Sequence, residues 1–192
     1  MGLAALCLCV AAVSCSGTDT DVDAGPDPDP PAETPTASAS AAAPVVTTAS
    51  VGRVAGRVGT AKRQRVKTVA TRIVDGYLDG AYAGTYPRTD FSAAFADFRA
   101  EARREAEQDL SLLTNADIGA QLTSASPTRR RLRIDVLAPR GRPSAATARF
   151  VLAFDTTGEV TRSMRVSGSL LLTRQRGAWK VFGYDVRPQV RS

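Results

Sequence analysis

The chain has 192 residues, a net charge of +6 and no histidine, which excludes histidine acid–base catalysis, Ser-His-Asp triads and imidazole metal sites. Its three cysteines all lie within the first 15 residues, so the remainder has neither an internal disulfide nor a thiolate metal site. The sequence therefore predicts a domain stabilised by a packed core, with no metal or other cofactor.

Charge divides the chain into two unlike parts. Residues 1–50 contain six acidic residues and no Lys or Arg, whereas residues 51–192 contain all 25 basic residues and the other 13 acidic ones. The net charges of the two parts are therefore −6 and +12. A basic domain held near an anionic membrane or wall polymer is attracted to it, and salt weakens this attraction. Simple solvation of an arginine-rich surface is the alternative interpretation.

Residues 3–13 form an apolar run of 11 residues. The run is too short to span a bilayer, which takes about 20 residues, but it suits the core of a signal peptide. The sequence Ala12-Val13-Ser14-Cys15 at its end resembles a bacterial lipobox, although Ala12 replaces the usual leucine and no Lys or Arg precedes the run. We expect residues 1–14 to be a signal peptide and Cys15 to carry diacylglycerol, which anchors the chain on the extracytoplasmic face of the cell membrane. Ordinary secretion and a buried or mispredicted terminus are the alternatives.

Residues 15–60 are rich in Pro, Ala, Thr and Asp. Such a composition cannot bury enough apolar surface to offset the entropy lost on ordering, so we expect a disordered, lipid-anchored tether. Gly52, Gly56 and Gly59 superficially resemble a phosphate-binding loop. No strand is predicted before them, however, and no Lys-Ser or Lys-Thr pair follows them, so they are assigned to the tether.

Two helices are predicted at the start of the domain, which we expect to span residues 61–188 and to be followed by a tail, 189–192. The first should end near Gly84 or Pro87, and its apolar residues recur at steps of three and four: Val66, Val69, Ile73, Tyr77 and Ala81. The second should begin at Asp90 as N-cap and carry an apolar stripe of Phe91, Phe95, Phe98 and Ala102. Residues 115–122 predict a short third helical turn.

The rest of the domain alternates apolar and polar residues with a period of two. This pattern predicts four antiparallel strands at about 131–136, 148–155, 162–173 and 178–186. Helices followed by a meander indicate an α+β fold, with N-terminal helices packed on a curved antiparallel sheet of about four strands. In the last strand, Trp179 and Val181 are expected in the core, and Phe182 and Tyr184 on the opposite face.

The same alternation places four arginines on the sheet face that points away from the core. Inward-pointing positions are expected at Leu132, Ile134, Val136 and Phe150, so the outer face carries Arg131, Arg133, Arg149 and Arg165. Because like charges repel unless an anion meets them, we hypothesise that this face docks an acidic partner protein or an anionic envelope polymer. Ordinary solvation is the alternative. The run Arg129-Arg130-Arg131 lacks interleaved aromatic residues, so no nucleic-acid partner is predicted.

The end of the chain resembles the last hairpin of the cone-shaped, nuclear-transport-factor-like or cystatin-like superfamily. The matching residues are Arg165-Val166, Leu170-Leu171-Leu172, Arg176-Gly177-Ala178-Trp179-Lys180-Val181 and Tyr184-Asp185-Val186. The likeness is strongest to extracytoplasmic proteins associated with the mammalian-cell-entry lipid transport systems of actinobacteria. It covers residues 61–188, with its specific part at the C-terminal end. Those relatives usually begin with a membrane-spanning helix, where this chain has a lipobox-like segment.

The resemblance implies a cone-shaped domain, a fold that hosts enzymes, ligand carriers and scaffolds. We expect a non-enzymatic accessory or interaction subunit at the cell envelope, with a lipid transport system as one setting. The alternative is a carrier that encloses a small apolar ligand in the cone, if Phe91, Phe95, Phe150 and Phe154 line the interior rather than fill it. An enzyme would need an aspartate as base and a tyrosine as donor, chosen from Asp75, Asp79, Asp90, Tyr77, Tyr82 and Tyr86.

Overall fold

Four long strands that follow one another in sequence form most of the sheet. They are β3 (Leu122–Leu137), β4 (Ala145–Gly158), β5 (Arg162–Gln175) and β6 (Ala178–Val190), and each pairs antiparallel with the next. The computed structural model describes residues 44–190, with side chains as far as Arg187. All four strands coincide with predicted ones, because apolar and polar residues alternate along each of them.

Two further strands make the sheet mixed and six-stranded, and neither was predicted. Strand β1 (Thr48–Ala55) pairs parallel with β3 at the sheet edge, and β2 (Gly84–Thr85) pairs antiparallel with β3. The α+β class is confirmed, whereas the count of about four strands and the wholly antiparallel arrangement are not. The tether predicted over residues 15–60 therefore overlaps a strand. Gly52 and a bulge between Val51 and Val54 interrupt the alternation that would have revealed it.

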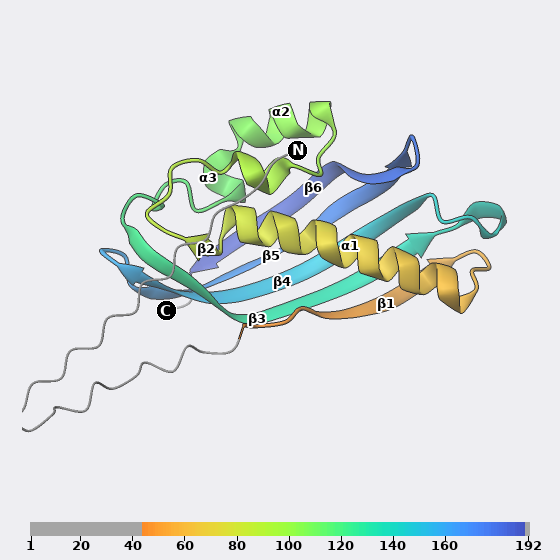
Figure 1. Cartoon of the computed structure of the whole chain (residues 1–192), viewed down its shortest axis with the longest axis horizontal. Coiled ribbons are helices and arrows are strands. Elements are labelled where there is room, and N and C mark those ends of the chain that lie inside the picture. The colour runs from red at the N-terminus through yellow and green to blue at the C-terminus, as the bar shows by residue number, and fades with distance from the viewer. Residues whose placement is uncertain (1–43, 191–192) are drawn as a thin grey trace, which may run out of the picture. The chain divides into compact units, whose positions relative to one another are not determined.

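Helix α1 (Thr60–Ala81) lies along one face of the sheet (Figure 1). It confirms the first predicted helix, which we expected to end near Gly84. The helix packs closely against another segment at Gly80, where an added Cβ would lie 2.5 Å from the backbone nitrogen of Ala94. Gly80 therefore lets α1 and the segment that contains Ala94 come together.

The second predicted helix is divided into three short pieces: η1 (Ser92–Phe95), α2 (Ala100–Gln108) and α3 (Leu110–Leu113). Between η1 and α2 the backbone pairs with the edge of β6 instead of continuing as a helix. The amide of Arg99 donates to the carbonyl of Val181 at 2.8 Å, and the amide of Val181 donates to the carbonyl of Asp97 at 2.9 Å. Most of residues 115–122 form turns rather than the expected helical turn.

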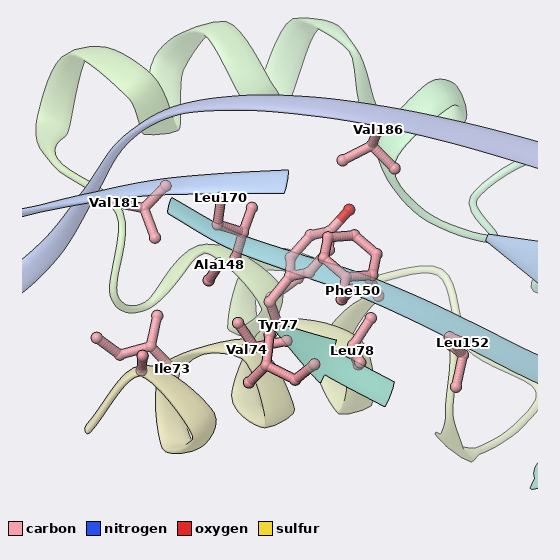
Figure 2. Packing of buried hydrophobic residues seen from close by; sticks show 14 of the residues in the cluster. Ile73, Val74, Tyr77, Leu78, Ala148, Phe150, Leu152, Leu170, Val181 and Val186 are labelled. Carbon is pink, nitrogen blue, oxygen red and sulfur yellow. The ribbon is translucent and has the colours of Figure 1, made fainter. Parts of the chain in front are cut away.

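Aromatic side chains fill the space between α1 and the sheet. Figure 2 shows Tyr77 of α1 beside Phe150 of β4, and their ring centroids lie 5.8 Å apart. Further ring pairs at 5.2–6.4 Å join the members of this cluster, which are Tyr77, Tyr82, Phe95, Phe98, Phe150, Phe154 and Tyr184. Leu132, Ile134 and Val136 are buried, as predicted for the inner face of the sheet.

Tyr184 lies on the inner face of the sheet, contrary to the prediction that it shares the opposite face with Phe182. A bulge pairs Leu171 with Gly183 but Leu172 with Val181, so Phe182 is the extra residue and the alternation shifts by one. The Tyr184 hydroxyl donates to the carboxylate of Asp109 at 3.0 Å. Desolvation and this bond raise its pKa to about 12. Val181 is buried, as expected, and Trp179 is half-buried.

Candidate functional site

The sheet face opposite α1 carries the candidate arginines. Strand register brings Arg133 of β3 directly opposite Arg149 of β4, and Arg131 lies two residues along the same strand from Arg133. Arg165 of β5 lies opposite Ala153 of β4. All four predicted arginine side chains are exposed. We call this surface the outer arginine face and include Arg129 in it, because Arg129 also lies opposite Ala153.

Asp135 divides the outer arginine face into a paired part and an unpaired part. Its carboxylate forms ion pairs with Arg149 and, at 3.8 Å, with Arg133. It also accepts a 2.8 Å hydrogen bond from the backbone amide of Arg53, on β1. This amide, followed by the two arginines, holds the pKa of Asp135 below its usual value. Arg133 and Arg149 are therefore partly neutralised within the protein.

Arg129, Arg131 and Arg165 form the unpaired part. Among residues 44–187 no carboxylate lies within ion-pair distance of any of them. Arg129 and Arg165 flank Ala153 from neighbouring strands, so their backbones lie about 10 Å apart. Together with Arg131 they surround a depression of about 430 Å³, lined further by Thr128, Val151 and Ala153. Three positive charges around a small apolar floor form a site suited to an anionic group.

An apolar patch continues the same face toward the β3–β4 hairpin. Leu137 and Phe182 are exposed, at 51% and 44% of their surface. They line a shallow depression of about 240 Å³ together with Leu171 and Ala145. Phe182 lies on this face, as the alternation along the last strand predicted, and it is the extra residue of the β6 bulge. The outer face thus combines arginines with exposed large apolar side chains.

Arg130 points to the other side of the sheet, because it alternates with Arg129 and Arg131 and lies opposite the buried Leu152. Its guanidinium pairs with Asp79 at 2.5 Å and lies 4.0 Å from Asp75, both on α1. Asp75 also accepts a hydrogen bond from the hydroxyl of Thr47 at 2.5 Å. Asp75 and Asp79, two of the three aspartates considered as catalytic bases, therefore hold α1 against β3.

Tyr77, Tyr86 and Asp90 also have structural partners, whereas the buried hydroxyl of Tyr82 has no hydrogen-bond partner among the described residues. The Tyr77 hydroxyl donates to the carbonyl of Leu113 at 2.7 Å, and that of Tyr86 donates to the carbonyl of Tyr82 at 3.1 Å. Burial raises the pKa of both Tyr77 and Tyr82. Asp90 accepts a hydrogen bond from the amide of Ser92, which lowers its pKa. None of these groups lines the depressions on the outer face of the sheet.

Residues 44–190 contain neither a candidate metal site nor a candidate membrane-spanning helix. No cluster of Asp, Glu, Cys or His there could hold a metal ion, and no helix is long and apolar enough to cross a membrane. Cys15, the predicted lipidation site, lies outside the described residues, as do the predicted signal peptide and most of the predicted tether.

Comparison with known proteins adds no family assignment. No protein-family model matches the chain, and a search of curated proteins finds no significant match.

Proposed function

We propose that this chain is a membrane-anchored extracytoplasmic lipoprotein, and that its folded domain is a non-enzymatic interaction subunit at the cell envelope. In this proposal Cys15 carries the lipid, and the outer arginine face docks an acidic segment of a partner protein. A cone-shaped, cystatin-like architecture related to the mammalian-cell-entry-associated proteins is part of the proposal. It is supported by the C-terminal sequence pattern and by α1 packing along one face of the sheet.

The observation that carries the proposal is the unpaired arginine cluster. Arg129, Arg131 and Arg165 gather around one depression without a carboxylate partner among residues 44–187, whereas Arg133 and Arg149 share Asp135. Concentrated like charge is unfavourable in the free protein and becomes favourable when carboxylates meet it. Arginine forms bidentate bonds with carboxylates, which gives such a contact direction as well as strength.

The neighbouring apolar patch favours a protein over a simple polyanion as the partner. Protein interfaces are enriched in arginine and aromatic residues, and their energetic centres are large side chains that become fully desolvated. Phe182 and Leu137 offer such contacts on the same face, next to Asp135 and about 20 Å along the strands from the unpaired arginines. A carbohydrate or phosphate polymer would use the charges but leave these side chains exposed to water.

The anchor is tested by replacing the predicted lipidation site. We expect the wild-type chain to stay in the membrane fraction of its own host after a wash in about 1 M salt, where electrostatic attraction is screened within about 3 Å. The Cys15→Ala chain should be released by the same wash, because only charge would then hold it. Fractionation followed by immunoblotting measures both. Retention of Cys15→Ala through the wash would show that the anchor lies elsewhere.

The docking face is tested with the unlipidated Cys15→Ala chain and isolated envelopes of its host. We expect co-sedimentation that weakens with salt and falls at least tenfold in a variant carrying Arg129→Glu, Arg131→Glu and Arg165→Glu. The control carries three charge reversals of equal net charge at exposed residues away from this face: Arg57→Glu, Arg104→Glu and Arg176→Glu. This control should bind within about twofold of the unsubstituted chain.

Treating the envelopes with protease separates the two possible kinds of partner. Loss of binding after digestion supports a protein partner, whereas binding that survives digestion indicates a lipid or polymer surface and overturns this part of the proposal. Equal binding by the arginine-face variant and its control would remove the outer arginine face from the function altogether.

A further inference from the structure

A second open site lies on the α1 side of the sheet, far in sequence from the outer arginine face. It is a cleft of about 400 Å³ between the N-terminal half of α1, the chain that leads into β4, and the β5–β6 hairpin. We call it the α1 cleft. Its lining residues are Lys62, Arg65, Val66, Val69, Arg142, Pro143, Arg174, Gly177 and Trp179. Its volume falls within the range of small-molecule sites, about 300–1,000 Å³.

The floor of the α1 cleft is apolar. Val66 is buried, and Val69 and Trp179 are partly buried against the main core, so each presents one side to the open space. Trp179 is the only tryptophan of the chain. Phe91, Phe95, Phe150 and Phe154, considered as the lining of an apolar cavity, are instead buried in the packed core. The open apolar surface on this side therefore lies at the α1 cleft.

The rim of the cleft is cationic. It comprises Lys62, Arg65, Arg142 and Arg174, and no acidic residue is among the lining residues. The Lys62 amine donates to the carbonyl of Gly141 at 3.1 Å, and the Arg174 guanidinium donates to that of Gly177 at 3.2 Å. Arg65 and Arg142 are exposed and form no ion pair with a described residue. Two of the four cations are thus held in place, and two are free to turn toward a ligand.

We propose that the α1 cleft binds a single-chain amphiphile with an anionic head group, a carboxylate or a phosphate ester. The head group would contact Arg65 and Arg142 at the rim, because guanidinium groups form charge-assisted, bidentate bonds with such anions. The hydrocarbon chain would cover Val66, Val69 and the indole of Trp179. A neutral apolar ligand would leave the cationic rim unused, and a small inorganic anion would leave the apolar floor exposed.

Because Trp179 lines the α1 cleft, its fluorescence should report the binding of a ligand there. The full Cys15→Ala chain is titrated with decanoate, dodecanoate and dodecyl phosphate below their critical micelle concentrations, and its tryptophan fluorescence is followed. We expect a saturable change with one ligand per chain, and about fourfold tighter binding for each methylene group added from decanoate to dodecanoate. Saturation by the carboxylates alone assigns fatty acids, and saturation by the phosphate alone assigns lipid phosphates. Dodecyltrimethylammonium and inorganic phosphate should give no saturable change.

Substitutions separate binding at the cleft from effects on folding. Arg65→Gln with Arg142→Gln should weaken dodecanoate binding about tenfold or more, since it removes both free cations without touching the core. The matched control, Arg57→Gln with Arg104→Gln, changes net charge equally and should leave affinity within about twofold. Isothermal titration repeats both measurements without relying on the tryptophan.

Three results would overturn the inference: no saturable binding of any anionic amphiphile, equal binding of the cationic amphiphile, or unchanged affinity in the Arg65/Arg142 variant. The inference is independent of the docking proposal. The Arg129/Arg131/Arg165 variant should bind dodecanoate like the unsubstituted chain, so each proposal can fail without the other.

Discussion

Replacing Phe150 with alanine should destabilise the domain by about 3–5 kcal/mol, a large share of the 5–15 kcal/mol typical of a folded domain. Phe150 is 2% exposed and packs edge-on against Tyr77 of α1 (Figure 2). Truncation removes the apolar surface that the ring buries on folding. It also leaves a cavity between the helix and the centre of the sheet, which the neighbouring side chains fill only in part. Urea denaturation followed by circular dichroism measures the loss in the free energy of unfolding.

Phe182→Ala is the matched control for this core substitution. It removes the same side chain from the outer face, where 44% of Phe182 is already exposed. We expect a loss of about 1 kcal/mol or less, since less surface leaves water and no enclosed cavity forms. Equal losses for the two variants would contradict the assignment of Phe150 to the centre of the core.

The central strands could be predicted because alternation along a strand is a local property of the chain. Leu132, Ile134 and Val136 must share a face once the backbone is extended, and the face with more apolar residues is the one that is buried. The same parity placed Arg131, Arg133 and Arg149 together on the outer face. The sequence alone thus predicted the four long strands of the sheet and most of the cationic surface.

Features that depend on contacts between distant segments were missed. Strand β1 is ordered by parallel pairing with β3, which lies about 80 residues away, and its own sequence alternates poorly. The helix predicted from Asp90 is broken at Phe98 because that segment pairs with Val181 of β6. In both cases tertiary pairing overrides the local preference of the chain.

The two candidate sites differ in the same way. The outer arginine face lies on adjacent strands. The alternation along each strand places Arg131 and Arg165 on the side away from the core, and this was enough to predict the face. The pairing of Asp135 with two of the arginines depends on strand register, which could not be predicted from the sequence. The α1 cleft joins residues from a helix, a loop and a hairpin, so no pattern of spacing brings Arg65, Arg142 and Trp179 together.

Two glycines one turn apart on α1 should respond to alanine in opposite directions. At Gly80 an added Cβ would lie 2.5 Å from the nitrogen and 2.6 Å from the Cα of Ala94, so the segment carrying η1 must move away from the helix. At Gly76 nothing lies within 4 Å of the added atom. We expect Gly80→Ala to destabilise the domain by about 1–3 kcal/mol through overpacking, despite the better helix propensity of alanine.

Gly76→Ala should instead stabilise the domain by about 0.5–1 kcal/mol, because alanine loses less backbone entropy in a helix and meets no neighbour. Both substitutions have the same chemistry on the same helix, so the difference between them isolates the contact with Ala94 from propensity. Parallel urea titrations give the two free energies of unfolding. If both variants were stabilised, the close packing of α1 on η1 would be refuted, and with it the explanation of why this long helix has a glycine at position 80.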